Sequence, residues 1–408
     1  MTRSAIRAGA AILTSSLLAA VPPASAQESN FEAVSTPSLT AGWTITPSLI
    51  YATSYDDNVL VRSSIDNPLS DTTNVVAPGA NVVFNGRKTH FDATYDGAFL
   101  MYRDFNSLNS YDQHLYMQTR NSLSKHLVLY GRQIVAAVPT TELVDFIAVP
   151  FVRTGSRLND TVGGIEAAIS KRTSLSAEYN FQWVEFDQIA EFGAFLSGGH
   201  SNGASVDVRH RLSNLLTLTA DYRLQHAFVS SGRELPVMAQ TFDVQNSTVG
   251  LERRLSDALK IFGALGISRL GLSDFGPART GPSYRVGLAR HFRTSSVDAE
   301  YGRSFVPSYG FGGTMQNEEL KIHVQVSPTR RLYTTSSIAW RRNEPLTIGE
   351  LSVRSWWVEG TVGYALQPWV RVEGFYGGSR QEITRAGGLA TRNRIGFQIV
   401  TTKPMRVR

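Results

Sequence analysis

Strict alternation of apolar and polar residues limits the fold of this 408-residue chain more than any other feature. In SLSAEYNFQW (174–183), odd positions are apolar or aromatic and even positions are polar. The same pattern recurs in LTLTADYRLQ (216–225) and ELKIHVQV (319–326). Successive side chains of a β-strand point to opposite faces, so each window predicts a strand with one apolar and one polar face.

Short turn phrases divide these strands into hairpins. RLSNLL (211–216), RLSDAL (254–259) and SLSKHL (122–127) are three variants of one phrase, and Asn85-Gly86 is a strong two-residue turn signal. Each interval between such turns holds two strands and one longer loop. A β-propeller has a similar repeat, but its strands have only about 5–6 residues, whereas these continue for ten or more.

Long amphipathic strands, joined alternately by short turns and long loops, are typical of outer-membrane barrels. The predicted fold is therefore all-β, a single antiparallel transmembrane β-barrel of the outer-membrane type. We count about eighteen strands, and uncertain boundaries leave 16–18 open. The apolar face would meet lipid, the polar face would meet a wet lumen, and closure would remove every unpaired edge.

Aromatic residues near the strand ends predict the orientation of the barrel. Membrane interfaces favour two aromatic belts, so short turns are expected to face the periplasm and long loops the exterior. The short-turn ends carry Trp43, Phe262, Phe292, Tyr333 and Trp369, and the long-loop ends carry Trp183, Phe186, Phe305 and Trp340.

The first 26 residues have the composition of a secretory signal. Two arginines precede an apolar run, and Ala24-Ser25-Ala26 provides a cleavage site before Gln27. We therefore expect a cleaved signal peptide (1–26), a short periplasmic lead (27–42), the barrel (43–400) and a C-terminal tail (401–408). No apolar run after residue 26 approaches the length of a membrane-spanning helix.

Composition excludes several classes of function. Cleavage would remove two arginines and no acids, so the formal net charge would fall from +6 to +4. This charge is not clustered, so it does not predict a nucleic-acid partner. The chain contains no cysteine and therefore neither disulfides nor thiolate metal sites.

Residues 54–114 carry a resemblance to a known family. The matching features are Tyr55-Asp56-Asp57-Asn58-Val59, Ser70-Asp71 leading to Pro78-Gly79, Tyr102, and Asn109 through His114. This segment resembles the N-terminal part of a family of outer-membrane β-barrel porins, some of whose members are associated with exopolysaccharide production and export. The resemblance implies outer-membrane residence and a polysaccharide connection, and it supplies no catalytic residues. Such barrels usually end on an aromatic residue, whereas here NRIGFQIV (393–400) is followed by TTKPMRVR.

Charged residues on the polar face form the predicted pore lining. A charge facing lipid at mid-membrane would cost roughly 2–4 kcal/mol, so these side chains should face the lumen. Both signs are mixed, which predicts a hydrated wall with little ion preference. The alternative is a ladder of cross-strand ion pairs in a mostly blocked barrel. The set comprises Glu178, Asp207, Arg209, Asp221, Arg223, Arg285, Asp298, Glu300, Lys321, Arg371 and Glu373.

The loop PTTELVDFIAVPFVRTGSR (139–157) is unusually apolar for an exposed connection. One prediction is that it folds inward and narrows the lumen, with Glu142, Asp145, Phe146 and Phe151 at the constriction. Packing on the outer rim or against a partner is the alternative.

Neither metal nor catalytic chemistry is indicated. Asp56-Asp57-Asn58 lacks the ligand rhythm of a calcium loop, and an exposed acidic turn is expected there. The eight histidines never show metal-ligand spacing, and no nucleophile motif appears. We therefore expect no cofactor and no enzyme activity.

Two functions remain. The first is a pore for polar solutes, with saccharides or exopolysaccharide as the class that the resemblance suggests. The second is a structural or assembly component of an envelope polysaccharide-export system, with a closed lumen. The expected partners are outer-membrane lipid, together with saccharide solutes or polymer-export proteins, and the sequence sets no oligomeric state.

Overall fold

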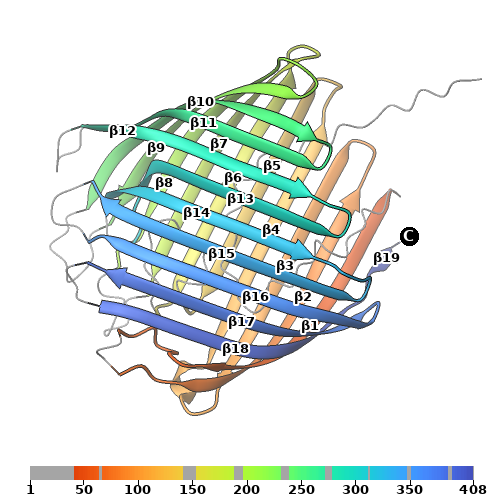
Figure 1. Ribbon diagram of the computed structural model, residues 1–408, viewed down its shortest axis with the longest axis vertical. Helices are drawn as coiled ribbons and strands as arrows, with labels where there is room; N and C mark the ends of the chain where they lie inside the picture. Colours follow the sequence, from red (N-terminus) through yellow and green to blue (C-terminus); the bar gives the residue numbers. More distant parts are fainter. Residues whose placement is uncertain are drawn as a thin grey trace, which may run out of the picture.

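Eighteen long antiparallel strands and one short strand form a single sheet that closes on itself (Figure 1). The structure is a computed structural model, and it describes residues 41–63, 67–140, 153–187, 196–230, 239–271, 278–310, 313–346, 351–384 and 388–407. The predicted signal peptide and most of the predicted lead lie outside these residues. The predicted fold class, a transmembrane barrel of about eighteen strands, is confirmed.

The long strands are β1 (Gly42–Asp56), β2 (Asp71–Asn85), β3 (Thr89–Tyr102), β4 (Ser110–Ser122), β5 (Leu127–Val138), β6 (Ser156–Ala168), β7 (Thr173–Phe186), β8 (Gly199–Arg211), β9 (Leu216–Val229), β10 (Gln240–Ser256), β11 (Leu259–Leu270), β12 (Arg279–His291), β13 (Ser295–Pro307), β14 (Thr314–Val326), β15 (Leu332–Pro345), β16 (Val353–Gln367), β17 (Val370–Ile383) and β18 (Gly388–Thr402). A 3₁₀ turn, η3 (Asn106–Leu108), precedes β4, and the short β19 (Met405–Val407) is the last of the described elements. No helix in the described part of the chain is long and apolar enough to cross a membrane.

Each strand pairs with the next along the chain, and β1 closes the barrel against β18 and β19. Residues 48–56 of β1 pair with β18, and residues 43–45 pair with β19. Pro47 lies between these two segments and has no N–H to donate, which explains the break. The structure differs here from the predicted free tail at 401–408, because most of that segment is part of the closure.

The two faces of the wall differ as the alternation predicts. On β11, Leu265 and Ile267 face outward and are 74% and 57% exposed, while Ser268, the next residue after Ile267, is buried. Charged residues that form ion pairs occupy the lumenal face of β10 to β13. An apolar exterior and a polar interior are the arrangement that lipid contact requires.

The predicted aromatic belts are only partly correct. Trp43, Phe292 and Trp369 at the short-turn end are about half exposed, as a belt requires. By contrast, the Tyr333 hydroxyl donates to the lumenal Glu373, and the Phe262 ring lies beneath the lumenal Arg285. Phe186 and Phe305 belong to a buried cluster inside the barrel. Tertiary packing, and not lipid contact, accounts for these four rings.

Candidate functional site: the barrel lumen

The strand register identifies the lumenal face of each strand. Glu319 of β14 lies opposite Arg341 of β15, and both side chains are largely buried inside the wall. Every second residue of a strand lies on the same face, and its register partner on the next strand lies on that face too. Applied from strand to strand, this rule identifies the lumenal residues of the whole barrel. All eleven residues of the predicted lining lie on this lumenal face. Their role in solute passage stays a prediction.

Opposite charges within the predicted set often pair. Arg209 Nε lies 3.0 Å from Asp207 Oδ1, and Arg371 Nε lies 2.9 Å from Glu373 Oε1. Glu178 instead accepts a hydrogen bond of 2.6 Å from the Tyr130 hydroxyl. Such pairing neutralises the wall locally while leaving many donors and acceptors on it.

Further lumenal ion pairs follow the same alternation but were not singled out from the sequence. The signal that could have found them is the same period of two, applied to the remaining strands. They join Arg120 to Glu166, Arg132 to Asp160, Lys260 to Glu252, and Arg341 and Lys321 to Glu319.

Solvent reaches the lumenal charges of β8 to β13 much more than those of β17. The Arg285 and Glu300 side chains are 37% and 44% exposed, and those of Lys260 and Glu252 are 34% and 32% exposed. Across the barrel, the Arg371 side chain is only 10% exposed and that of Glu373 only 4%. The Arg209 and Asp207 side chains of β8 are about one-quarter exposed, so the wall of β8 to β13 borders a wet space. Tyr333 and Gln398 donate to Glu373 of β17 and help to cover its ion pair.

An apolar cluster occupies the interior at the long-loop end. It joins residues at the long-loop ends of β5, β6, β7, β9, β10, β11 and β13 with residues that follow β7, β13 and β15. Its members are Ala136, Val138, Leu158, Val184, Phe186, Leu196, Ala227, Val229, Phe242, Val244, Leu270, Phe305, Tyr309 and Leu346, with Ile134 packed against them. We call this set the mouth cluster. Side chains of this kind exclude water, so the mouth cluster narrows the lumen there.

The end of β13 leaves the wall to join the mouth cluster. Register pairs with β12 stop at Arg303, and the Phe305 N–H donates to the Ser268 hydroxyl on β11. A Cβ added at Gly281 would lie 2.7 Å from the Phe305 ring, so glycine makes room for it. This departure explains why alternation alone misplaced Phe305.

Two loops then meet inside the mouth. The Ser197 N–H donates to the Gly310 carbonyl (2.7 Å), and the Gly310 N–H donates to the Ser197 carbonyl (2.8 Å). Gly310 has φ +113°, which L-residues rarely adopt. Beside it, burial raises the pKa of the Tyr309 hydroxyl to about 12, so this group stays protonated at neutral pH. We call the paired segments the loop bridge.

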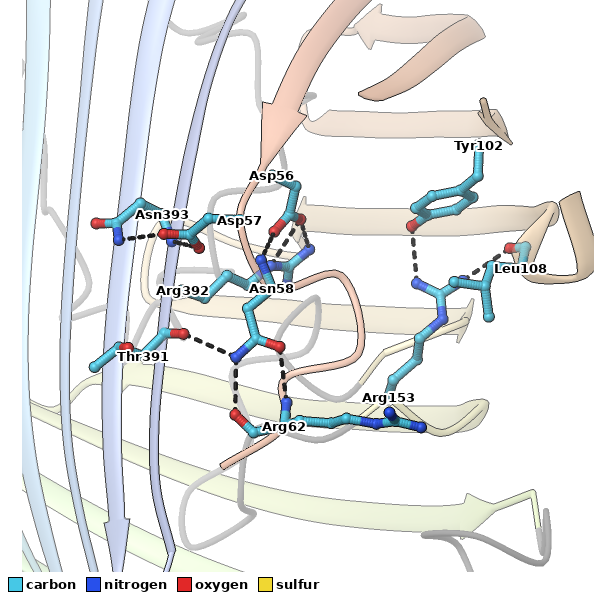
Figure 2. A network of polar contacts seen from close by, with 10 residues as sticks. All are labelled: Asp56, Asp57, Asn58, Arg62, Tyr102, Leu108, Arg153, Thr391, Arg392 and Asn393. Carbon is cyan, nitrogen blue, oxygen red and sulfur yellow. Dashed lines mark hydrogen bonds and ion pairs between the residues drawn. The ribbon is translucent and has the colours of Figure 1, made fainter. Parts of the chain in front are cut away.

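The first long loop is tied to β18 by a polar network (Figure 2). Arg392 Nε donates to Asp56 Oδ2 (2.8 Å), and the Asn393 amide donates to Asp57 Oδ2 (2.7 Å). Asn58 Nδ2 donates to the carbonyls of Arg62 and Thr391, both at 2.8 Å. The predicted exposed acidic turn is therefore wrong at two of its three positions, because Asp56 and Asn58 are 1% and 0% exposed. Hydrogen bonds between residues more than 300 positions apart in the sequence therefore satisfy the polar groups of this loop.

The predicted constriction loop is described only at its edges. Glu142, Asp145, Phe146 and Phe151 lie outside the described residues. At the loop's C-terminal edge, Arg153 donates to the Tyr102 hydroxyl and to the Leu108 carbonyl, each at 2.8 Å (Figure 2). Tyr102 is buried on the lumenal face of β3, so this edge is anchored inside the barrel. No group of three His, Cys, Asp or Glu residues in the described ranges could hold a metal ion.

Comparisons with known proteins return solved structures of low sequence identity. No protein-family model matches the sequence, and no curated protein sequence does either. Among solved structures, OccAB3 of Acinetobacter baumannii is 11% identical, with 89% of this chain and 99% of that chain covered and a TM-score of 0.44. OccK2 (OpdF) of Pseudomonas aeruginosa, solved in complex with glucuronate, is 12% identical, with 90% and 98% covered and a TM-score of 0.46. The FrpB iron transporter of Neisseria meningitidis is 11% identical, with 85% and 62% covered and a TM-score of 0.44. The fold assignment accordingly depends on the strand order and register of this chain.

Proposed function

We propose that this protein is an outer-membrane barrel whose lumen accepts polar, uncharged solutes, with saccharides as the solute class. The wet, charge-paired wall of β8 to β13 carries this proposal. Ion pairs such as Arg209–Asp207 and Lys260–Glu252 neutralise part of its charge, and the side chains of Arg285 and Glu300 remain about two-fifths exposed. Solutes rich in hydroxyl groups form many modest hydrogen bonds, and a wall of this kind offers both donors and acceptors.

The mouth cluster and the loop bridge support a second candidate. A lumen closed at its long-loop end would suit a structural or assembly component of a polysaccharide-export system. In that case the long loops would contact partner proteins, and solutes would not cross. The two candidates differ in whether the lumen conducts.

Single-channel recording in a planar bilayer distinguishes these two functions. For the pore, we expect discrete conductance steps. Because the wall charges pair, the reversal potential under a tenfold salt gradient should stay well below the limit of about 59 mV for perfect selectivity between monovalent ions. Neutral oligosaccharides should reduce the open-channel current when added, and small saccharides should swell proteoliposomes.

Two results would contradict this proposal. Strong preference for either ion sign would contradict the charge-paired wall. Absence of conductance from correctly folded protein would exclude the pore and favour the closed structural role.

A further inference from the structure

The outer face of the barrel carries a group of three arginines near the long-loop ends of β15, β16 and β17. Arg342 lies directly opposite Arg354 in the β15–β16 register. Arg380 lies opposite Trp356, diagonal to Arg354. Arg354, Arg380 and Trp356 are all exposed, whereas Val353 and Ser355, which flank Arg354, are buried on the lumenal side. These three arginines therefore face away from the lumen.

Nearby carboxylates neutralise this group only in part. Glu318 of β14 lies opposite Arg342 in the register and accepts hydrogen bonds from Tyr284 and Tyr301. Arg342 pairs with Glu344 on its own strand. No acid within the described residues lies within ion-pair distance of Arg354 or Arg380, although Glu382 lies opposite Arg354 in the register. Directly opposed like charges destabilise a strand pair, and nearby lipid strengthens the repulsion. An anion between the guanidinium groups would remove this cost.

Two tryptophan side chains lie next to the Arg342–Arg354 pair on the outer face, further from the long-loop ends of the strands. Trp340 of β15 is directly opposite Trp356 of β16, and Trp356 is 53% exposed on the outer face. Indole rings favour the level at which lipid headgroups meet acyl chains. Arg342 and Arg354 are closer to the strand ends than these rings, at the expected level of the headgroups, and Arg380 lies at the level of Trp356.

We propose that Arg342, Arg354 and Arg380 bind the phosphate of a phosphorylated lipid headgroup in the leaflet on the long-loop side, with Trp340 and Trp356 against its acyl region. Guanidinium groups match phosphate oxygens in geometry and charge. The lipid-facing position and the two indole rings favour a lipid over free phosphate. The proposal depends on the membrane residence included in the proposed function, but not on conduction through the lumen.

The test compares the full mature protein with the double variant Arg354→Gln/Arg380→Gln. Binding of diphosphorylated lipid A in detergent micelles is measured by native mass spectrometry, with phosphatidylcholine as the reference lipid. Because charge-assisted contacts are lost, we expect the double variant to bind lipid A at least about tenfold more weakly. The control is Arg157→Gln, since Arg157 is exposed on the outer face of β6 but lies near Glu185 (3.7 Å) and Asp187 (3.6 Å). It should bind like the unmodified protein.

Three results would overturn the proposal: equal lipid A binding by the double variant, equal binding of phosphatidylcholine, or full displacement of lipid A by inorganic phosphate. A dimer of the unmodified protein that the double variant loses, with lipid binding unchanged, would instead assign the surface to a second copy of the chain. Conductance is measured separately, so failure of this site and failure of the pore are distinguishable.

Discussion

Two residue doublets show how a single step along a strand changes a side chain's surroundings. Glu318-Glu319 on β14 lie opposite Arg342-Arg341 on β15. Glu319 lies on the lumenal face, and its Oε1 atom lies 2.6 Å from Arg341 Nη2 and 3.3 Å from Lys321 Nζ. Glu318 lies on the outer face and accepts hydrogen bonds from the Tyr284 and Tyr301 hydroxyls. Identical residues therefore have different electrostatic roles because alternation places them on opposite sides of one wall.

We predict that Glu319→Gln destabilises the barrel far more than Glu318→Gln. Removing the Glu319 charge leaves the largely buried Arg341 poorly compensated, at a cost of up to about 3–5 kcal/mol. A glutamine at 318 can still accept the tyrosine hydrogen bonds, so the change there should stay within about 1 kcal/mol. Urea unfolding midpoints of the two variants in lipid vesicles provide the measurement. Equal losses would show that the lumenal ion pair does not stabilise the wall.

The strands form the regular wall of the barrel, and the segments between them determine how far the lumen is closed at its long-loop end. The wall of β8 to β13 is accessible to solvent, whereas the mouth cluster closes around residues from β5 to β15. The loop bridge joins the segment before β8 to the segment after β13, which come from well-separated parts of the wall (Figure 1). Two backbone hydrogen bonds, each contributing about 0.5–1.5 kcal/mol, make a weak restraint.

Gly310→Ala should weaken this bridge and increase the conductance or open time of single channels. Alanine disfavours the φ of +113° that Gly310 adopts, so the segment should move away from Ser197. Gly163→Ala is the matched control, because a Cβ there meets nothing within 4 Å. Unchanged conductance in a correctly folded Gly310→Ala protein would mean that the loop bridge does not limit passage.

At the scale of the whole molecule, closure joins the two ends of the chain into one hydrogen-bonded ring. β1 contacts β2 on one side and β18 with β19 on the other, so the long strands leave no open edge. The Asp56–Arg392 contact strengthens the same seam from the lumenal side (Figure 2). A closed sheet must break many backbone hydrogen bonds together before it unfolds.

We therefore expect heat-modifiable migration of the detergent-folded protein in gel electrophoresis. The unheated barrel should stay compact in detergent and migrate differently from the boiled, unfolded chain. A far-ultraviolet circular dichroism spectrum dominated by strand should accompany it. Identical migration with and without boiling would contradict a stable closed barrel.

The positions of the strands and the faces of their side chains were predictable from the sequence. Period-two alternation is a local property, set by residues one and two positions apart, so the predicted windows 174–183, 216–225 and 319–326 fall within β7, β9 and β14. The same rule placed all eleven predicted residues on the lumenal face, and it could have found Glu319 and Arg341 as well.

Only the tertiary structure decided which lumenal residues meet water and where the interior is filled. Asp56 and Arg392 are 336 positions apart, and no local pattern predicts that they bury each other's charge. Phe305 follows the alternation of β13 but lies inside the barrel, because β13 leaves its register with β12 after Arg303. Such contacts depend on the distance across a closed ring, a quantity that arises only when every strand is in place.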